Sequence, residues 1–137
     1  MPRSTTCQSE KAHAMNLHEL DSFTTAYIEC ALWSSTDNST PSGGYPLDDN
    51  FGPEDIASET LAVMVADCAD FQASFGERIA SNLERAGHDF WLTRNRHGAG
   101  FWDGDWPEAD GKFLTDMSHP YGSVDLYIGD DGLIHAA

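Results

Sequence analysis

The segment HDFWLTRNRHGAGFWD, residues 88–103, concentrates the side chains of this chain that could do chemistry. Its histidines, His88 and His97, titrate near neutral pH and could act as acid, base or metal ligand. Asp89 and Asp103 could supply a second acid or base beside them. The segment has no HExxH or HxH spacing, so surface or structural roles are more typical of such residues. We therefore assign no catalytic residue and no metal ligand, and we do not expect an enzyme.

The same segment could also hold an anion. Arg94 and Arg96 are its densest positive charge, and the backbone N–H groups of HGAG lie directly after them. A phosphate-binding loop needs a strand before it and a helix after it, whereas here a second strand is expected. We favour a structural interpretation, in which Gly98 and Gly100 permit a turn and a bulge while the arginines pair with nearby carboxylates.

The aromatic residues of the segment predict a β-hairpin. Phe90 and Trp91 would face opposite sides of one strand, and Phe101 and Trp102 return after turn-forming residues 95–98. One face can enter the core, and the other needs a cover from inside the domain or from a protein partner. The candidate binding residues are Trp91, Arg94, His97, Trp102, Asp103, Asp105 and Trp106.

Asp103 and Asp105 also raise the possibility of a calcium loop. The required glycine is missing from the loop, and Leu114 stands where such a loop needs a terminal glutamate. The sequence contains no nucleotide-binding loop or nucleophile motif either. We expect no metal and no cofactor.

Apolar residues at three- and four-residue steps predict two helices before this segment. The first begins after Asn16 as its N-cap and ends near Ser34. The second follows Ser58 and continues toward Gly87, a left-handed C-cap, with a possible junction at Gly76. Its apolar stripe consists of Leu61, Met64, Cys68, Phe71, Phe75, Ile79 and Leu83.

The remaining elements are shorter. Residues 35–52 are rich in Ser, Pro, Gly, Asp and Asn and predict a long loop, and PEDIA at 53–57 predicts one turn of helix. Residues 111–117 predict a short helix, and alternation over 124–135 predicts a second hairpin. The fold class is α+β, with N-terminal helices packed on one face of a small antiparallel sheet built from two C-terminal β-hairpins.

The length of 137 residues suits one domain, which we place at residues 16–137, with residues 1–15 as a disordered N-terminal extension. The net charge is -16, from 23 acidic and 7 basic residues. Such a surface disfavours direct binding to nucleic acid or to anionic membranes. The three cysteines show no metal-ligand spacing, and no apolar run could span a membrane, so we expect a cytoplasmic protein.

Four segments carry a resemblance to a known family: FTTAYIECALWSS, SGGYPLDDNF, GHDFWLTRNRHGAGFWDGDWPE and VDLYIGDDGLI. From Met15 to the C-terminus the chain resembles small acidic proteins encoded by bacteriophages and prophages. The resemblance implies an accessory phage product that acts on a host or phage process. It supplies no catalytic residue, and the related sequences have glycine where this chain has Arg96.

These observations support three hypotheses of function. The first is a non-enzymatic phage accessory protein that binds a basic or nucleic-acid-binding host or phage protein, such as an acidic, DNA-mimicking inhibitor of a defence or processing enzyme. The second is a small-ligand-binding protein or enzyme in which His88, Arg94, His97 and Asp103 converge on one pocket. The third is a structural phage component whose charge keeps it soluble.

Overall fold

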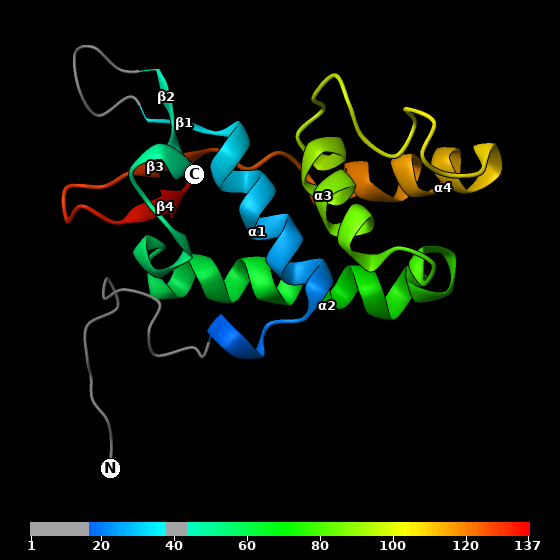
Figure 1. Ribbon diagram of the computed structural model, residues 1–137, viewed down its shortest axis with the longest axis horizontal. Helices are drawn as coiled ribbons and strands as arrows, with labels where there is room; N and C mark the ends of the chain where they lie inside the picture. The colour runs from blue at the N-terminus through cyan, green and yellow to red at the C-terminus, as the bar shows by residue number, and fades with distance from the viewer. Residues whose placement is uncertain (1–16, 38–43) are drawn as a thin grey trace.

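The computed structural model describes residues 17–37 and 44–137, apart from the side chain of His18, so the predicted extension and the Asn16 cap lie outside the described residues. The described helices are α1 (Ser22–Ser34), α2 (Ser58–Ile79), α3 (Leu83–Arg94) and α4 (Glu108–Ser118). Figure 1 shows α1 lying across α2, with α3 and α4 at one end of the molecule and the strands at the other.

Short elements connect these helices. Strands β1 (Thr36–Asp37) and β2 (Tyr45–Pro46) form one antiparallel pair, and β3 (Leu126–Ile128) and β4 (Ile134–Ala136) form another. Single 3-10 turns occupy η2 (Leu17–Glu19), η3 (Leu47–Asp49), η4 (Pro53–Asp55) and η5 (His119–Tyr121). The α+β class is confirmed, but the described strands form two separate pairs instead of one sheet covered by helices.

Helix α1 begins later than its sequence predicts. The chain makes a 3-10 turn at η2, and Asp21 then becomes the N-cap, because its Oδ1 accepts the N–H of Thr24 at 2.8 Å. The second carboxylate oxygen accepts from Nε2 of Gln72 on α2 at 3.1 Å. One aspartate therefore both starts α1 and connects it to α2.

Helix α2 confirms the predicted apolar stripe. Leu61, Met64, Cys68 and Phe71 are buried along one face, as their spacing requires. The backbone departs from helical geometry at Phe75, beside the predicted junction. The helix ends at Ile79 instead of continuing to Gly87, because Asn82 caps a new helix by accepting the N–H of Arg85 at 3.0 Å.

The predicted hairpin over residues 88–103 is wrong, since its first half belongs to helix α3 and its second half is a loop without strands. Every residue from Asp89 to Arg94 is buried, so α3 is covered on all sides at its C-terminal half. A helix buried all round shows no apolar stripe, and its sequence resembles a two-sided strand. The predicted Gly87 cap instead lies inside α3, against α1.

The turn-forming residues 95–98 end α3. Arg96 adopts a left-handed conformation with φ 58°, and the N–H groups of Arg96 and His97 each donate to carbonyls in the last turn, those of Thr93 and Leu92, at 3.0 Å. This is the hydrogen-bond pattern of a Schellman helix end, which usually places glycine in the left-handed position.

The second predicted hairpin is confirmed. Strands β3 and β4 pair with Tyr127 opposite His135, and a turn at residues 129–132 joins them. The N–H of Ala57 donates to the carbonyl of Ile134 at 2.9 Å, which attaches the hairpin to the start of α2. The predicted helical turn at 53–57 and the helix at 111–117 correspond to η4 and α4.

An aromatic cluster fills the space among the helices. Phe71 of α2 stacks on Phe90 of α3 at 4.2 Å between ring centroids, and Tyr27 of α1 lies 5.4 Å from Phe90. Phe101, from the loop after α3, stacks on Phe71 from another side at 6.0 Å. The residues of the 88–103 segment therefore contribute a large part of the core.

Substituting Gly87 by alanine tests the close contact between α1 and α3. An added Cβ would lie 2.0 Å from the carbonyl oxygen of Phe23, so the helices must separate. We expect Gly87→Ala to lower the free energy of unfolding by about 1–3 kcal/mol or more, measured by urea denaturation. Gly76→Ala is the matched control, because nothing lies within 4 Å of its added Cβ. Equal effects of the two substitutions would contradict the packing described here.

Candidate functional site

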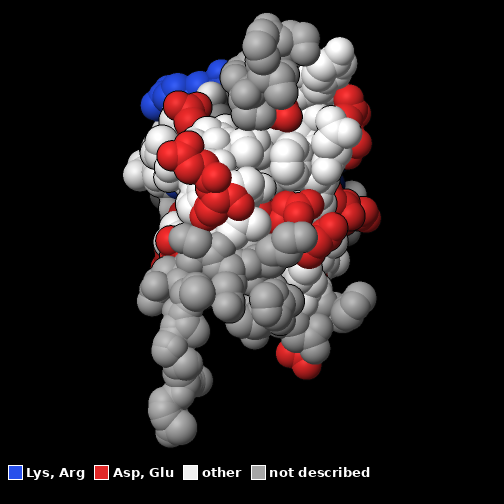
Figure 2. Space-filling view, turned by 90° about the vertical axis from the view of Figure 1, so that its left-hand side faces the viewer, with Lys and Arg blue, Asp and Glu red and all other residues white. Residues whose placement is uncertain are grey.

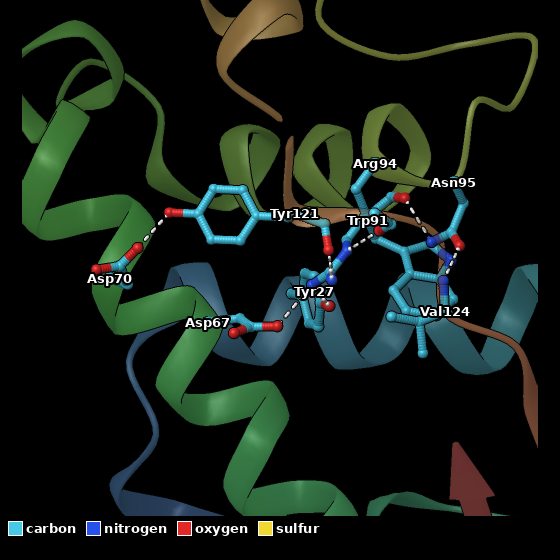
Figure 3. Close-up of polar contacts among 9 residues, drawn as sticks. Tyr27, Asp67, Asp70, Trp91, Arg94, Asn95, Tyr121 and Val124 are labelled. Atoms are coloured by element: carbon cyan, nitrogen blue, oxygen red, sulfur yellow. Dashed lines mark hydrogen bonds and ion pairs between the residues drawn. The ribbon is translucent and has the colours of Figure 1, made fainter. Parts of the chain in front are cut away.

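Arg94 is the polar centre of the molecule, as Figure 3 shows. From the last turn of α3 its Nη1 donates to the Tyr27 hydroxyl of α1 at 3.0 Å and to Oδ2 of Asp67 of α2 at 2.8 Å. Its Nε and Nη2 donate to the carbonyls of Gly122 and Tyr121, both at 2.8 Å. One buried guanidinium therefore joins α1, α2, α3 and the chain after α4.

Neighbouring contacts complete this Arg94 cluster. Asn95 accepts the N–H of Val124 at 2.7 Å and donates to the carbonyl of Trp91 at 2.9 Å. The hydroxyl of Tyr121 donates to Asp70 at 2.5 Å. Burial raises the pKa of the Tyr27 hydroxyl well above its usual value, so this group stays protonated. Because its donors are already occupied by protein atoms, Arg94 has a structural role here.

The structure separates the seven candidate binding residues into two groups. Trp91, Arg94 and Trp106 are buried, and the Trp91 indole N–H donates to Ser34 at 2.7 Å. The cover for these aromatic rings therefore comes mostly from inside the domain, and of the three candidate tryptophans only Trp102 is exposed, at 44%. The exposed candidates are His97, Trp102, Asp103 and Asp105. Whether these four contact a partner stays a prediction.

The four residues of the second hypothesis do not all converge, although Asp103 lies near enough to His88 for its charge to act on that imidazole. His88 lines a groove between α1 and α3, whereas His97 lines a different groove beside Ser34 and Val124. Arg94 is buried between them, and its partners are those described above. The predicted pocket made by these four side chains is not formed.

A different cluster surrounds Asp89, and it is incompletely paired. Oδ2 of Asp89 accepts the indole N–H of Trp106 at 2.8 Å. Its Oδ1 lies 3.9 Å from both Nη1 of Arg85 and Nδ1 of His88, which is beyond hydrogen-bond distance. Among the described residues, Oδ1 of Asp89 and Nδ1 of His88 are the buried side-chain atoms without a hydrogen-bond partner.

Burial controls the protonation of this cluster. Desolvation raises the pKa of Asp89 to about 6, although the Trp106 hydrogen bond and the charge of Arg85 oppose the shift. Desolvation, assisted by Arg85, lowers the pKa of His88. At neutral pH the cluster therefore contains an ionised carboxylate with one unpaired oxygen and a neutral imidazole, both suited to accept hydrogen bonds.

The groove beside this cluster is formed by α1, α3 and η3. Its lining residues are Ala26, Glu29, Cys30, Trp33, Asp48, Asn82, Glu84, Arg85 and His88. Burial, with a smaller contribution from Asp89, raises the pKa of the Cys30 thiol to about 12. The thiol is therefore protonated at neutral pH and is a poor nucleophile. The groove is suited to binding and lacks the activated nucleophile that covalent chemistry would require.

The hairpin interpretation missed this groove. Arg85, His88 and Asp89 are separated by three and four positions, which places them on one side of a helix. That spacing would have grouped them if residues 83–94 had been interpreted as helical. No sequence signal links them to Trp33 of α1, because that contact depends on how the helices pack.

Two further properties of the described residues concern metal ions and membranes. Within residues 17–37 and 44–137, no group of three or more His, Cys, Asp or Glu side chains is arranged to hold a metal ion. No helix in this part of the chain combines the length and apolar character needed to cross a membrane.

Comparisons with family models, with curated proteins and with solved structures gave no match to this chain.

Replacing Arg94 tests its structural role. Lysine keeps the charge, but its single nitrogen cannot reach the Tyr27 hydroxyl, the Asp67 carboxylate and the two backbone carbonyls together. Buried acceptors therefore lose their donors. We expect Arg94→Lys to lower the free energy of unfolding by about 3–5 kcal/mol, measured by thermal and urea unfolding. Arg96→Lys is the control, because Arg96 is exposed. A loss of stability no larger than that of the control would contradict the assigned role.

Asp89 gives a prediction with a defined pH dependence. Its pKa rises from 3.8 to about 6 on folding, so the folded protein takes up a proton between these values and loses stability as the pH rises through that window. We expect Asp89→Asn to raise the free energy of unfolding at pH 7 by up to about 3 kcal/mol, with no gain near pH 4. Asp130→Asn is the control, because Asp130 is exposed and lies outside this cluster. A gain for Asp89→Asn that is equal at both pH values would contradict this account.

Proposed function

We propose that this chain is a phage or prophage accessory protein of the small acidic kind that it resembles, and that it binds a basic, nucleic-acid-handling protein of the host. The observation that carries the proposal is the uneven distribution of charge. No lysine or arginine occurs between Lys11 and Arg78 or after Lys112, whereas acidic residues continue through both regions.

The fold brings these two regions together at the strand end of the molecule. The bridge between Ile56 and Ile134 joins the start of α2 to β4, and β1 contacts β3. Exposed acidic residues here, which we term the strand-end carboxylates, are Asp49, Glu54, Glu59, Asp125 and Asp130. Figure 2 faces this end and shows acidic side chains in a band across its middle, with basic ones mainly at its upper edge.

Two exposed tyrosines accompany the carboxylates. The exposed fractions are 53% for Tyr45 of β2 and 48% for Tyr127 of β3. Tyrosine is enriched among residues that dominate binding energy at protein interfaces. Aromatic contacts near a rim of negative charge are suited to a basic protein surface, where the charges accelerate association and the rings contribute affinity.

The charge pattern favours inhibition by mimicry of a nucleic acid. A cleft that binds phosphates attracts a dense array of carboxylates by the same electrostatics, so the protein would compete with DNA or RNA for it. Such an inhibitor acts inside the cell, where nucleic-acid enzymes work. The buried free thiols of Cys30 and Cys68 are compatible with a reducing compartment.

A capture experiment from bacterial lysate tests this proposal. The tagged protein is compared with the triple variant Asp49→Asn, Asp125→Asn, Asp130→Asn and with the matched control Glu77→Gln, Glu108→Gln, Asp116→Asn, which loses the same charge elsewhere. We expect the native protein and the control to retain a nucleic-acid enzyme at low salt and release it at high salt, because surface electrostatics are screened. The strand-end triple variant should retain much less, as quantified by mass spectrometry.

Two results would overturn the proposal. One is the absence of any retained protein at either salt concentration. The other is equal retention by both triple variants, because binding would then not depend on the strand end. Purified partner and duplex DNA should finally compete for the same enzyme in a binding assay, and failure to compete would exclude mimicry.

A further inference from the structure

The groove between α1, α3 and η3 is strongly acidic, and none of the strand-end carboxylates lines it, although its Asp48 is the chain neighbour of Asp49. Its three glutamate and aspartate side chains, Glu29, Asp48 and Glu84, have no ion-pair partner among the described residues. Arg85 is the cation of the groove, and its charge is already balanced by Asp89 at 3.9 Å and Asp105 at 3.8 Å. The groove therefore presents a net negative potential to anything that enters it.

An exposed tryptophan forms one wall of this groove. The exposed fraction of Trp33 is 58%, the second highest among the described large hydrophobic residues. Its ring lies 6.3 Å from the ring of His88, with the two planes tilted by 34°. The face of an exposed indole beside unpaired carboxylates is suited to bind a cation.

An unpartnered atom on a residue of the groove wall, Nδ1 of His88, points to a ligand independently of the surface charges. Asp89 does not itself line the groove; its Oδ1 lies 3.9 Å from Nη1 of Arg85 and from Nδ1 of His88, two of the three α3 residues that do. Nδ1 of His88 is also unpartnered within the described structure. A buried imidazole nitrogen without a partner costs free energy, and a ligand that donates an N–H group to it would recover part of that cost.

We propose that this groove binds the guanidinium group of an arginine side chain presented by a protein partner. That the arginine belongs to a protein partner rests on the proposed function. That the groove binds a guanidinium group does not. A guanidinium is planar and stacks on an indole, and its five N–H donors can reach acceptors on several sides. An ammonium group offers three donors and no stacking plane, so arginine should bind better than lysine.

A titration with a short peptide tests the groove without any partner. The tripeptide Gly-Arg-Gly, blocked at both ends, is added to the full chain, and the indole N–H of Trp33 and the ring of His88 are followed by NMR. We expect saturable shifts at both residues. The same peptide with citrulline, which has the shape of arginine without its charge, should leave them unchanged, and Gly-Lys-Gly should bind more weakly.

Variants assign the binding to the groove. We expect Trp33→Leu to weaken binding about two- to fivefold through loss of the cation–π contact, and the double variant Glu29→Gln, Glu84→Gln to weaken it about three- to tenfold. Trp102→Leu is the matched control, since it removes the other exposed indole. The absence of saturable shifts, equal binding of the citrulline peptide, or an equal effect of Trp102→Leu would each overturn the proposal.

The strand-end triple variant separates this inference from the proposed function. None of its three substituted residues lines the groove, so it should bind Gly-Arg-Gly nearly as the native protein does. Loss of peptide binding in this variant would place the cation site at the strand end and overturn the inference. If the peptide binds in the groove but lysate yields no basic partner, the proposed function fails and the guanidinium site stands.

Discussion

The buried guanidinium of Arg94 is the interaction on which the arrangement of the helices depends. Helices α1, α2 and α3 meet at this one side chain, and the chain after α4 closes over it through two backbone carbonyls. A buried cation is tolerated only when its donors are satisfied, so the helices must reach these positions together. Aromatic rings alone would allow them to slide, whereas directional hydrogen bonds fix one arrangement. Within this arrangement Phe90, one turn before Arg94, stacks on Phe71.

The same helix contains two buried ionisable residues with opposite effects on stability. Arg94 is matched by acceptors, and its charged form is favoured, since its pKa is raised despite burial. Asp89 has one good donor, and its charged form is disfavoured. A residue that lowers stability without an evident structural benefit is typical of a site retained for function, because stability and function often compete. Both residues lie in the buried C-terminal half of α3, so the same packing leaves one charge fully matched and the other only partly matched.

The parts of the fold that the sequence predicted are those with a single buried face. The stripe of α2 and the alternation of the β3–β4 hairpin each show a period, because one side contacts the core and the other water. Helix α3 shows none, since residues 89–94 are buried on every side. The aromatic residues of the 88–103 segment consequently resembled a two-faced strand. The groove was harder still to predict, because it requires Trp33 and His88 to meet, and only the packing of α1 on α3 determines that contact.

The distribution of the few cations follows from the same structure. Arg94 is buried in the core. Arg78 pairs with Asp110 at 3.1 Å, and Lys112 pairs with Asp116 at 3.0 Å. Arg85 faces Asp89 and Asp105 across the longer distances described above. Because these pairs lie on α2, α3, α4 and the loop before α4, the negative field is locally reduced at that end. Toward the strand end the described cation is the exposed Arg96, whose neighbours Asn95 and His97 line a groove with Asp125. The negative charge is therefore less neutralised at the strand end than at the end formed by α3 and α4. A basic surface approaching from solution would be oriented toward the strand end before any contact forms, since long-range attraction acts at distances of about 10 Å at moderate salt.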